Sequence, residues 1–176
     1  MIKFQSTIYS VGGKNIIRLP KNASSQLPSR GQVMVSARIN NHTFVTPLEP
    51  DGNFSHWFEV SKELSDTAIH AGDTISVSIE PTKDWPEPVV PDSLKAKISK
   101  SQKAKEIWAS ITPMARWEWI RWIRSSGNND TRQKRLDVAI SKMEAGKRRP
   151  CCWNRNLCTI PEVSKNGVLL EPSPAQ

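Results

Sequence analysis

Residues 16–36, IIRLPKNASSQLPSRGQVMVS, have a second copy in residues 57–77, WFEVSKELSDTAIHAGDTISV, at a constant offset of 41 positions. Each copy contains a strand, a proline or serine followed by lysine, a short polar turn or helix, a glycine (Gly31 or Gly72) and a second strand. The alternation of the second strand slips by one residue between the copies. A single copy cannot cover its own apolar face, so two copies in one chain are expected to pair with each other. The repeat therefore predicts an internal pseudo-dimer that closes into a β-barrel.

Short runs of alternating apolar and polar residues occupy the whole of residues 1–80. They are FQSTIYS, KNIIRL, VMVSARI, HTFVTPL, HWFEV and TISVSIE. Turns rich in Gly, Pro, Asn and Asp separate them, which indicates about six half-buried strands. The pattern ends at residues 81–91, PTKDWPEPVVP, where four prolines cannot continue a sheet. We therefore expect a β-barrel domain over residues 1–80 and an extended, Pro-rich linker over residues 81–91.

The periodicity after residue 91 is that of helices. Asp92 or Ser93 is the expected N-cap of a first helix, and Thr112-Pro113 is a start signal for the helix MARWEWIRWIRSS. We expect Asp130 to cap a last helix that ends at Gly146. These signals predict a small helical domain over residues 92–160 and a loose tail over residues 161–176. The fold class is α+β, a closed barrel followed by a basic helical domain.

Several segments also carry a resemblance to a known family. They are LPKN and HAGDTISVSIE in the β half, VPDSLKAKISKSQKAKEIWASITPMARWEWIRWIRSS, and the later DTRQKRLDVAISKMEAGKRR. Over residues 1–150 the chain resembles the bacterial bacteriocin-protection family, also called YdeI or OmpD-associated, in which a β domain of unknown function often precedes the helical one. The resemblance implies a barrel similar to the double-split barrel of AbrB-like proteins and no established catalytic residues. The family name refers to stress or bacteriocin protection and specifies no molecular activity.

The excess positive charge of the chain is confined to its second half. Residues 1–90 contain eight Lys/Arg and nine Asp/Glu, whereas residues 91–176 contain seventeen and eight. Such an excess favours an anionic partner. The candidate anion-binding residues, near the two ends of the last helix, are Arg132, Arg135, Lys147, Arg148 and Arg149.

Two of these candidates, Arg132 and Arg135, lie one turn apart at the expected N-terminus of that helix. Free backbone N–H groups and guanidinium groups at such a place can together hold a phosphate. In the structural alternative, the arginines pair with carboxylates and orient the helices. The carboxylates considered are Glu106, Glu118 and Asp137.

Seven tryptophans raise the further possibility of base stacking beside a basic surface. Trp119 and Trp122 share a helix face with Ile123, which predicts that both are core residues. Trp117 lies on the side of Arg121 and is the one candidate stacking residue in this helix. Packing in the core is the alternative role for Trp117.

Three cysteines lie in the stretch Arg148–Cys158, RRPCCWNRNLC. A structural zinc site usually has four ligands, whereas Cys151, Cys152 and Cys158 form no C-x-x-C pair and give only three. A fourth ligand would have to come from the histidines of the β half, which are His42, His56 and His70. We therefore expect no metal, and no disulfide in a reducing cytoplasm. The stretch is instead expected to close the helical domain through apolar packing, with an exposed basic edge.

No catalytic motif supports an enzyme. The sequence has no G-x-S-x-G, P-loop or H-E-x-x-H pattern, and no carboxylate pair stands out. We expect a non-enzymatic protein without a cofactor that binds a nucleic acid or another polyanion through its helical domain. The alternative is a protein-interaction or stress-protection factor. Because residues 1–10 lack the pattern of a signal peptide and no stretch approaches about 18 apolar residues, we expect a cytoplasmic location and no membrane span.

Overall fold

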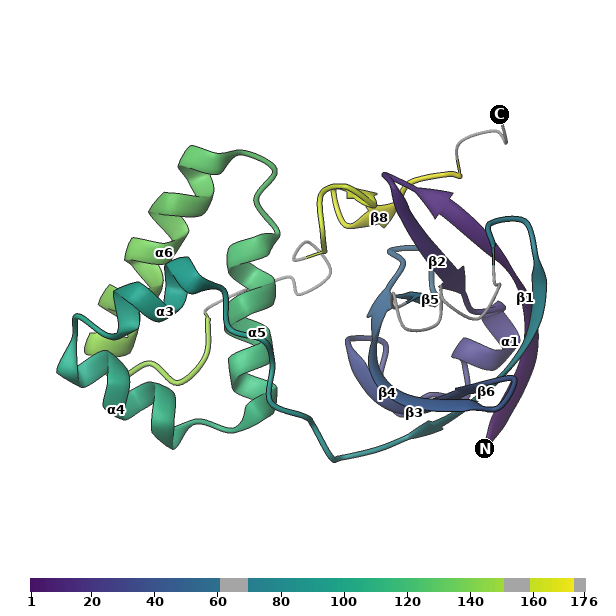
Figure 1. Ribbon diagram of the computed structural model, residues 1–176, viewed down its shortest axis with the longest axis horizontal. Coiled ribbons are helices and arrows are strands. Elements are labelled where there is room, and N and C mark those ends of the chain that lie inside the picture. Colours follow the sequence, from purple (N-terminus) through teal and green to yellow (C-terminus); the bar gives the residue numbers. More distant parts are fainter. Residues whose placement is uncertain (61–69, 151–158, 173–176) are drawn as a thin grey trace. The chain divides into compact units, whose positions relative to one another are not determined.

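The computed structural model describes residues 1–60, 70–150 and 159–172 and divides the chain into two compact units (Figure 1). Residues 1–84 form the barrel unit together with the C-terminal segment from residue 162, and residues 85–161 form the helical unit. The linker predicted over residues 81–91 is therefore divided, with residues 81–84 in the barrel unit and residues 85–91 in the helical unit. Its first residue, Pro81, ends a barrel strand, and Val90 packs on the core of the helical unit. No helix among the described residues is long and apolar enough to span a membrane.

Six strands form the barrel. They are β1 (Ile2–Val11), β2 (Lys14–Arg18), β3 (Val33–Ile39), β4 (His42–Pro50), β5 (His56–Glu59) and β6 (Thr74–Pro81), with the short helix α1 (Lys21–Ser24) between β2 and β3. The strands close in the order β1-β2-β5-β4-β3-β6, and all neighbours are antiparallel. The expected closed β-barrel is thus confirmed.

The strand order also bears on the internal repeat. Exchanging β1 with β4, β2 with β5 and β3 with β6 gives the same circular order of strands, read in the opposite direction around the barrel. Ile17 and Phe58, which are 41 positions apart, face each other across β2 and β5, as a two-fold axis between these strands would require. Both belong to the barrel core, and so do Val35 and Val77, which are 42 positions apart. The change of offset is the one-residue slip noted in the sequence.

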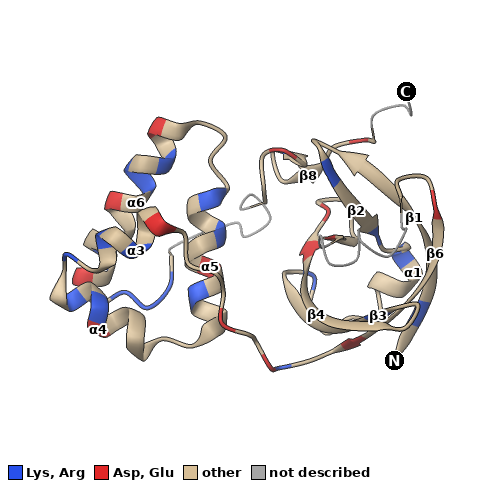
Figure 2. Cartoon of the chain, in the orientation of Figure 1, with Lys and Arg blue, Asp and Glu red and all other residues tan. Residues whose placement is uncertain are grey.

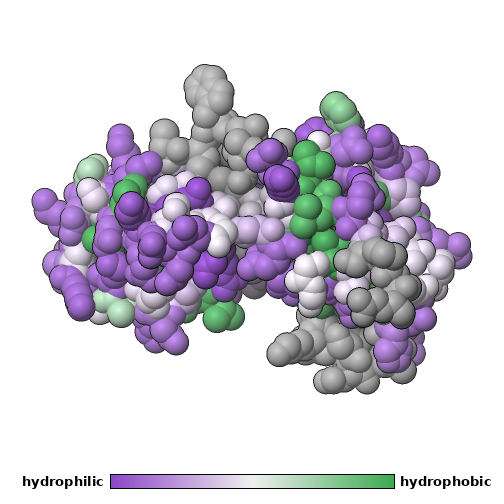
Figure 3. All heavy atoms as spheres, turned by 90° about the horizontal axis from the view of Figure 1, so that it is seen from above, coloured by the Kyte–Doolittle hydropathy of each residue, from purple (hydrophilic) through white to green (hydrophobic). Residues whose placement is uncertain are grey.

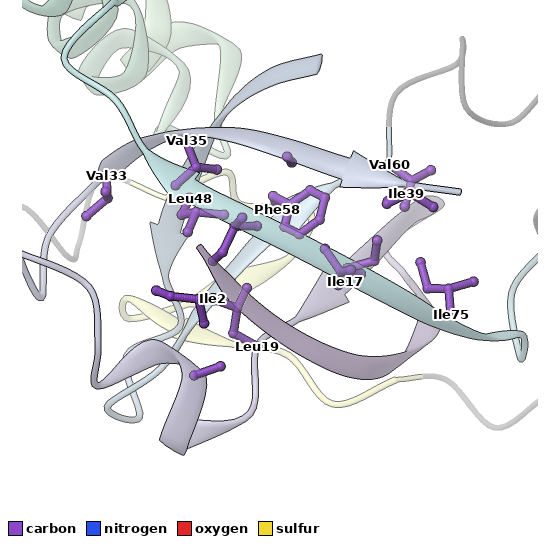
Figure 4. Packing of buried hydrophobic residues seen from close by; sticks show 14 of the residues in the cluster. Ile2, Ile17, Leu19, Val33, Val35, Ile39, Leu48, Phe58, Val60 and Ile75 are labelled. Carbon is purple, nitrogen blue, oxygen red and sulfur yellow. The ribbon is translucent and has the colours of Figure 1, made fainter. Parts of the chain in front are cut away.

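Alternating side chains of the strands fill the barrel (Figure 4). On β3 and β6 every second residue points inward, which gives the apolar positions from Val33 to Ile39 and from Ile75 to Ile79. Ile2, Ile17, Leu48 and Phe58 from the other strands fill the space between them, as Figure 4 shows. The alternation visible in the sequence therefore specifies the inner face of the barrel.

The C-terminal segment is part of the barrel unit, which corrects the expectation of a loose tail. Its strands β7 (Ser164–Lys165) and β8 (Val168–Leu169) form a hairpin, and the backbone N–H of Leu169 donates to the Asp51 carbonyl at 2.9 Å. Gly52 has a φ of +73°, and a Cβ atom there would lie 2.2 Å from the Gly167 carbonyl oxygen. Only glycine allows this approach of the two backbones.

The described residues of the helical unit contain four helices. They are α3 (Asp92–Ile98), α4 (Gln102–Ser110), α5 (Pro113–Arg124) and α6 (Asn129–Glu144). Thr112 caps α5 as expected, because its side chain accepts a hydrogen bond from the Ala115 N–H. Two expected caps are wrong: α3 follows Pro91 without a side-chain cap, and α6 is capped by Asn128 instead of Asp130. Apolar residues from all four helices pack into one core, including Leu94, Ala104, Trp119, Leu136 and Met143.

Candidate anion-binding surface of the helical unit

The five candidate cations divide into two groups at opposite ends of α6. Arg132 and Arg135 lie in its first two turns, and residues 147–149 follow its C-terminus. A helix of 16 residues is about 24 Å long at a rise of about 1.5 Å per residue. The structure therefore places the candidates in two separate groups instead of one surface.

Arg135 and Arg132 contact the C-terminal end of α5. Nη1 of Arg135 donates to the Trp122 carbonyl at 2.6 Å and to the Ser125 hydroxyl, and its guanidinium lies 5.3 Å from the centre of the Trp122 ring. Nη2 of Arg132 donates to the Ser126 carbonyl at 3.2 Å. The last carbonyls of a helix lack intrahelical partners and carry the negative end of its dipole. The two arginines therefore hold α6 against the end of α5.

Arg148 and Arg149 also contact the helices. Arg148 donates to the hydroxyl and the carbonyl of Ser110, the last residue of α4. Nη1 of Arg149 lies 3.3 Å from a carboxylate oxygen of Glu118, which is one of the pairings expected in the structural alternative. Lys147 is exposed, and within the described ranges its side chain makes no hydrogen bond or ion pair.

Trp117 is partly buried, and its Nε1–H donates to the Pro86 carbonyl at 2.8 Å. The preceding residue, Arg116, makes contacts that the sequence patterns did not indicate. Arg116 forms an ion pair with Glu87 at 2.6 Å, and its Nε donates to the Trp108 carbonyl at 3.0 Å. Arg116 thus acts like Arg148, since both bind carbonyls at the C-terminal end of α4.

The cations that remain available to solvent are mostly lysines. Lys95, Lys100, Lys103 and Lys105 are exposed, and in residues 1–60, 70–150 and 159–172 none of their side chains has a hydrogen-bond or ion-pair partner. Figure 2 shows the Lys and Arg positions spread over all four helices of this unit. The sequence did carry a signal for these lysines, because no acidic residue occurs from Ser93 to Lys105.

The barrel unit contains a buried Ser–His pair. The Ser24 hydroxyl lies 2.8 Å from Nδ1 of His56, and Nε2 of His56 lies 2.9 Å from the Gly31 carbonyl. Because a carbonyl can only accept, Nε2 carries the proton and Nδ1 accepts from Ser24. Ser24 and His56 are each 1% exposed. A nucleophile that a substrate cannot reach is unsuited to catalysis, so the pair is an internal link between α1 and β5.

Burial lowers the pKa of His56 below its ordinary value of 6.5, although the hydrogen bond to Gly31 and the charge of Asp51 act in the opposite direction. The unfolded chain therefore takes up a proton below pH 6.5 that the folded chain resists. We expect the free energy of unfolding to fall as the pH decreases from 6.5 through the lowered pKa, and to keep this contribution above pH 6.5. Thermal denaturation from about pH 7.5 to about pH 5.5 measures the effect.

Two variants isolate the contribution of His56. His56→Gln should have a shallower pH dependence, whereas His42→Gln, which replaces an exposed histidine, should keep the dependence of the unmodified protein. Equal slopes for all three proteins would contradict the assignment.

The three cysteines of the zinc hypothesis, Cys151, Cys152 and Cys158, lie outside the described residues. Among the residues that are described, no group of three or more His, Cys, Asp or Glu side chains is arranged to hold a metal ion.

Two family models match the chain, one in each unit. Residues 87–146 match the model described as Bacteriocin-protection, YdeI or OmpD-Associated. Residues 4–79 match the Domain of unknown function DUF1905. A comparison with curated proteins gives no match. The helical unit therefore matches the bacteriocin-protection, YdeI or OmpD-associated family, and the barrel that precedes it in the chain matches DUF1905.

Proposed function

We propose that this protein is a non-enzymatic, cytoplasmic binding protein whose helical unit holds a nucleic acid or another polyanion. The observation that carries the proposal is the distribution of charge between the two units. Residues 85–161 contain 16 Lys/Arg and 7 Asp/Glu, whereas the remainder of the chain contains 9 and 10. Clustered positive charge attracts phosphates and raises their local concentration.

The barrel contributes a second, weaker support. Its strand order is unchanged when the two halves of the repeat are exchanged, as in a barrel built from two equivalent copies. As part of the proposal, we assign it to the double-split type of AbrB-like proteins. The non-enzymatic part of the proposal is consistent with the burial of Ser24 and His56, which leaves their hydroxyl and imidazole out of reach of a substrate.

The test is a titration of labelled DNA and RNA with the full chain at several salt concentrations. We expect binding that is independent of base sequence and weakens steeply with salt, because each lysine–phosphate contact releases a counterion. Four contacts correspond to a slope of log K against log[salt] of about −3 to −4. Absence of binding at low salt to every nucleic acid would contradict the proposed function.

The alternative function is protein interaction in stress or bacteriocin protection, and one feature of the barrel unit favours it. Phe54 is 79% exposed and has a φ of +65°, in a turn whose backbone is held by the Asp51 carboxylate. Figure 3 shows that hydrophobic side chains also form a band on the surface of this unit. An exposed aromatic ring on a fixed turn is suited to anchoring a protein partner. Such a contact would depend little on salt, which separates it from phosphate binding.

A further inference from the structure

Five lysines occur within eleven residues of the segment that contains α3, the following turn and the start of α4. Lys97 is engaged, because it forms an ion pair with Asp137. The other four, which we call the lysine segment, are Lys95, Lys100, Lys103 and Lys105. All four are exposed, and within the described part of the chain none of their side-chain ammonium groups has a polar partner.

Three of the acidic residues near this segment have polar partners outside it or accept from a neutral side chain, and a fourth, Asp92, is exposed at the start of α3. Glu144 accepts a hydrogen bond from the Ser101 hydroxyl at 2.6 Å, and Glu106 accepts one from Gln102 at 3.1 Å. Asp137 is paired with Lys97. Glu106 and Glu144 keep their negative charge, because their donors are neutral, but within the described structure no carboxylate forms an ion pair with the lysine segment.

Arginine and lysine have different tasks in the helical unit. Arg116, Arg135 and Arg148 bind carbonyls at the ends of α4 and α5, where a planar guanidinium can reach two acceptors at once. Lysine is a compact, hydrated charge on a flexible stem and makes no such fixed contacts. The fold thus uses these arginines for packing and leaves the four lysines of the lysine segment for an external ligand.

We infer that the lysine segment is the contact surface of the proposed polyanion site and that its ligand is the sugar–phosphate backbone of a nucleic acid. This inference rests on the proposed function. Charges distributed over two helices and a turn fit a row of phosphates better than one small anion. Contacts to the backbone alone carry no sequence information, so binding is independent of base sequence.

The decisive variant replaces Lys95, Lys100, Lys103 and Lys105 together with glutamine. Glutamine is a good helix former, so the helices are preserved. The matched control makes the same change at four exposed lysines of the barrel unit whose side chains also have no polar partner among the described residues. These are Lys3, Lys21, Lys83 and Lys165. Fluorescence anisotropy with a labelled random-sequence DNA, single-stranded and double-stranded, measures affinity at several salt concentrations.

We expect the lysine-segment variant to lose most of the salt dependence, with the slope of log K against log[salt] reduced by about 3 to 4, and to bind at least about tenfold more weakly at low salt. The control variant should keep the slope of the unmodified protein. An Arg148→Ala/Arg149→Ala variant that remains folded should also keep it, because these side chains contact Ser110 and Glu118. Circular dichroism verifies that each variant is folded.

Each other outcome overturns a different statement. Binding by the intact protein that is unchanged in the lysine-segment variant overturns the location of the site. An equal loss in the control variant shows that net charge, and no particular surface, drives binding. Equal affinity for polyglutamate overturns nucleic acid as the ligand. No binding by the intact protein at low salt overturns the proposed function itself.

Discussion

Replacing Asp51 with alanine is expected to lower the free energy of unfolding of the barrel unit by about 3 kcal/mol, the lower end of the range for breaking a buried ion pair. The Asp51 side chain is fully buried. One carboxylate oxygen accepts hydrogen bonds from the N–H groups of Asn53 and Ser55, each at 2.7 Å. The other accepts from Nε of Arg18 at 3.0 Å and lies 2.9 Å from its Nη2. Alanine leaves these donors without an acceptor, which is costly where they are buried.

The cost stays near the lower end because Arg18 retains some contact with water. Its side chain is 29% exposed, so solvent screens part of the charge that the substitution strands. Urea denaturation followed by circular dichroism measures the loss. Asp84→Ala is the control in the same unit, since Asp84 is exposed and its carboxylate has no partner among the described residues. It should change the stability by less than about 0.5 kcal/mol. A loss below about 1 kcal/mol for Asp51→Ala would show that this network is not a principal support of the barrel.

Asp51 also illustrates what the sequence could not indicate. Asp51 lies in one of the turns rich in Gly, Pro, Asn and Asp that were predicted between the strands, and this turn is present between β4 and β5. The partner of its aspartate, Arg18, is 33 positions away in the sequence. A long-range pairing of this kind leaves no local pattern, whereas hydrophobic alternation along each strand does. The closed barrel was therefore predictable and its buried ion pair was not.

The same distinction applies to the candidate site. Arg132 and Arg135 were chosen because they lie near a helix N-terminus, and they do, but their guanidinium groups bind the end of the preceding helix. Hydrogen bonds from arginine to backbone carbonyls involve no particular residue type on the accepting side, so sequence patterns cannot reveal them. A lysine-rich run without acidic residues is visible in the sequence from composition alone, as the stretch from Ser93 to Lys105 shows.

The tail was the largest error in the predicted organisation, and it too has a physical reason. The final residues are rich in proline, which is typical of irregular segments. What attaches residues 162–172 to the barrel is close backbone approach at Gly12 and Gly52, both with positive φ. A Cβ atom on Gly12 would lie 1.9 Å from the Glu162 carbonyl oxygen. The requirement for glycine depends on a partner more than a hundred residues away.

Replacing Trp119 with alanine should have a still larger effect on the helical unit, with a loss of about 3–5 kcal/mol. Trp119 is fully buried, its Nε1–H donates to the Arg148 carbonyl at 3.2 Å, and its ring meets Trp122 edge-on with centroids 6.1 Å apart. The substitution removes apolar contacts in the core and leaves a cavity that the surrounding helices fill only partly. Hydrogen exchange should show lost protection in α3–α6 while the barrel strands stay protected, because each unit has its own core.

Trp117→Ala is the matched control, and it also tests the stacking role considered for this residue. Trp117 is partly buried and loses one hydrogen bond, to the Pro86 carbonyl, which is worth about 1 kcal/mol. If nucleic acid binds by backbone contacts to the lysine segment, Trp117→Ala should keep both the affinity and the salt slope of the unmodified protein. A loss of affinity for single strands only, with an unchanged slope, would instead assign Trp117 to base stacking, since stacking adds binding energy without releasing counterions.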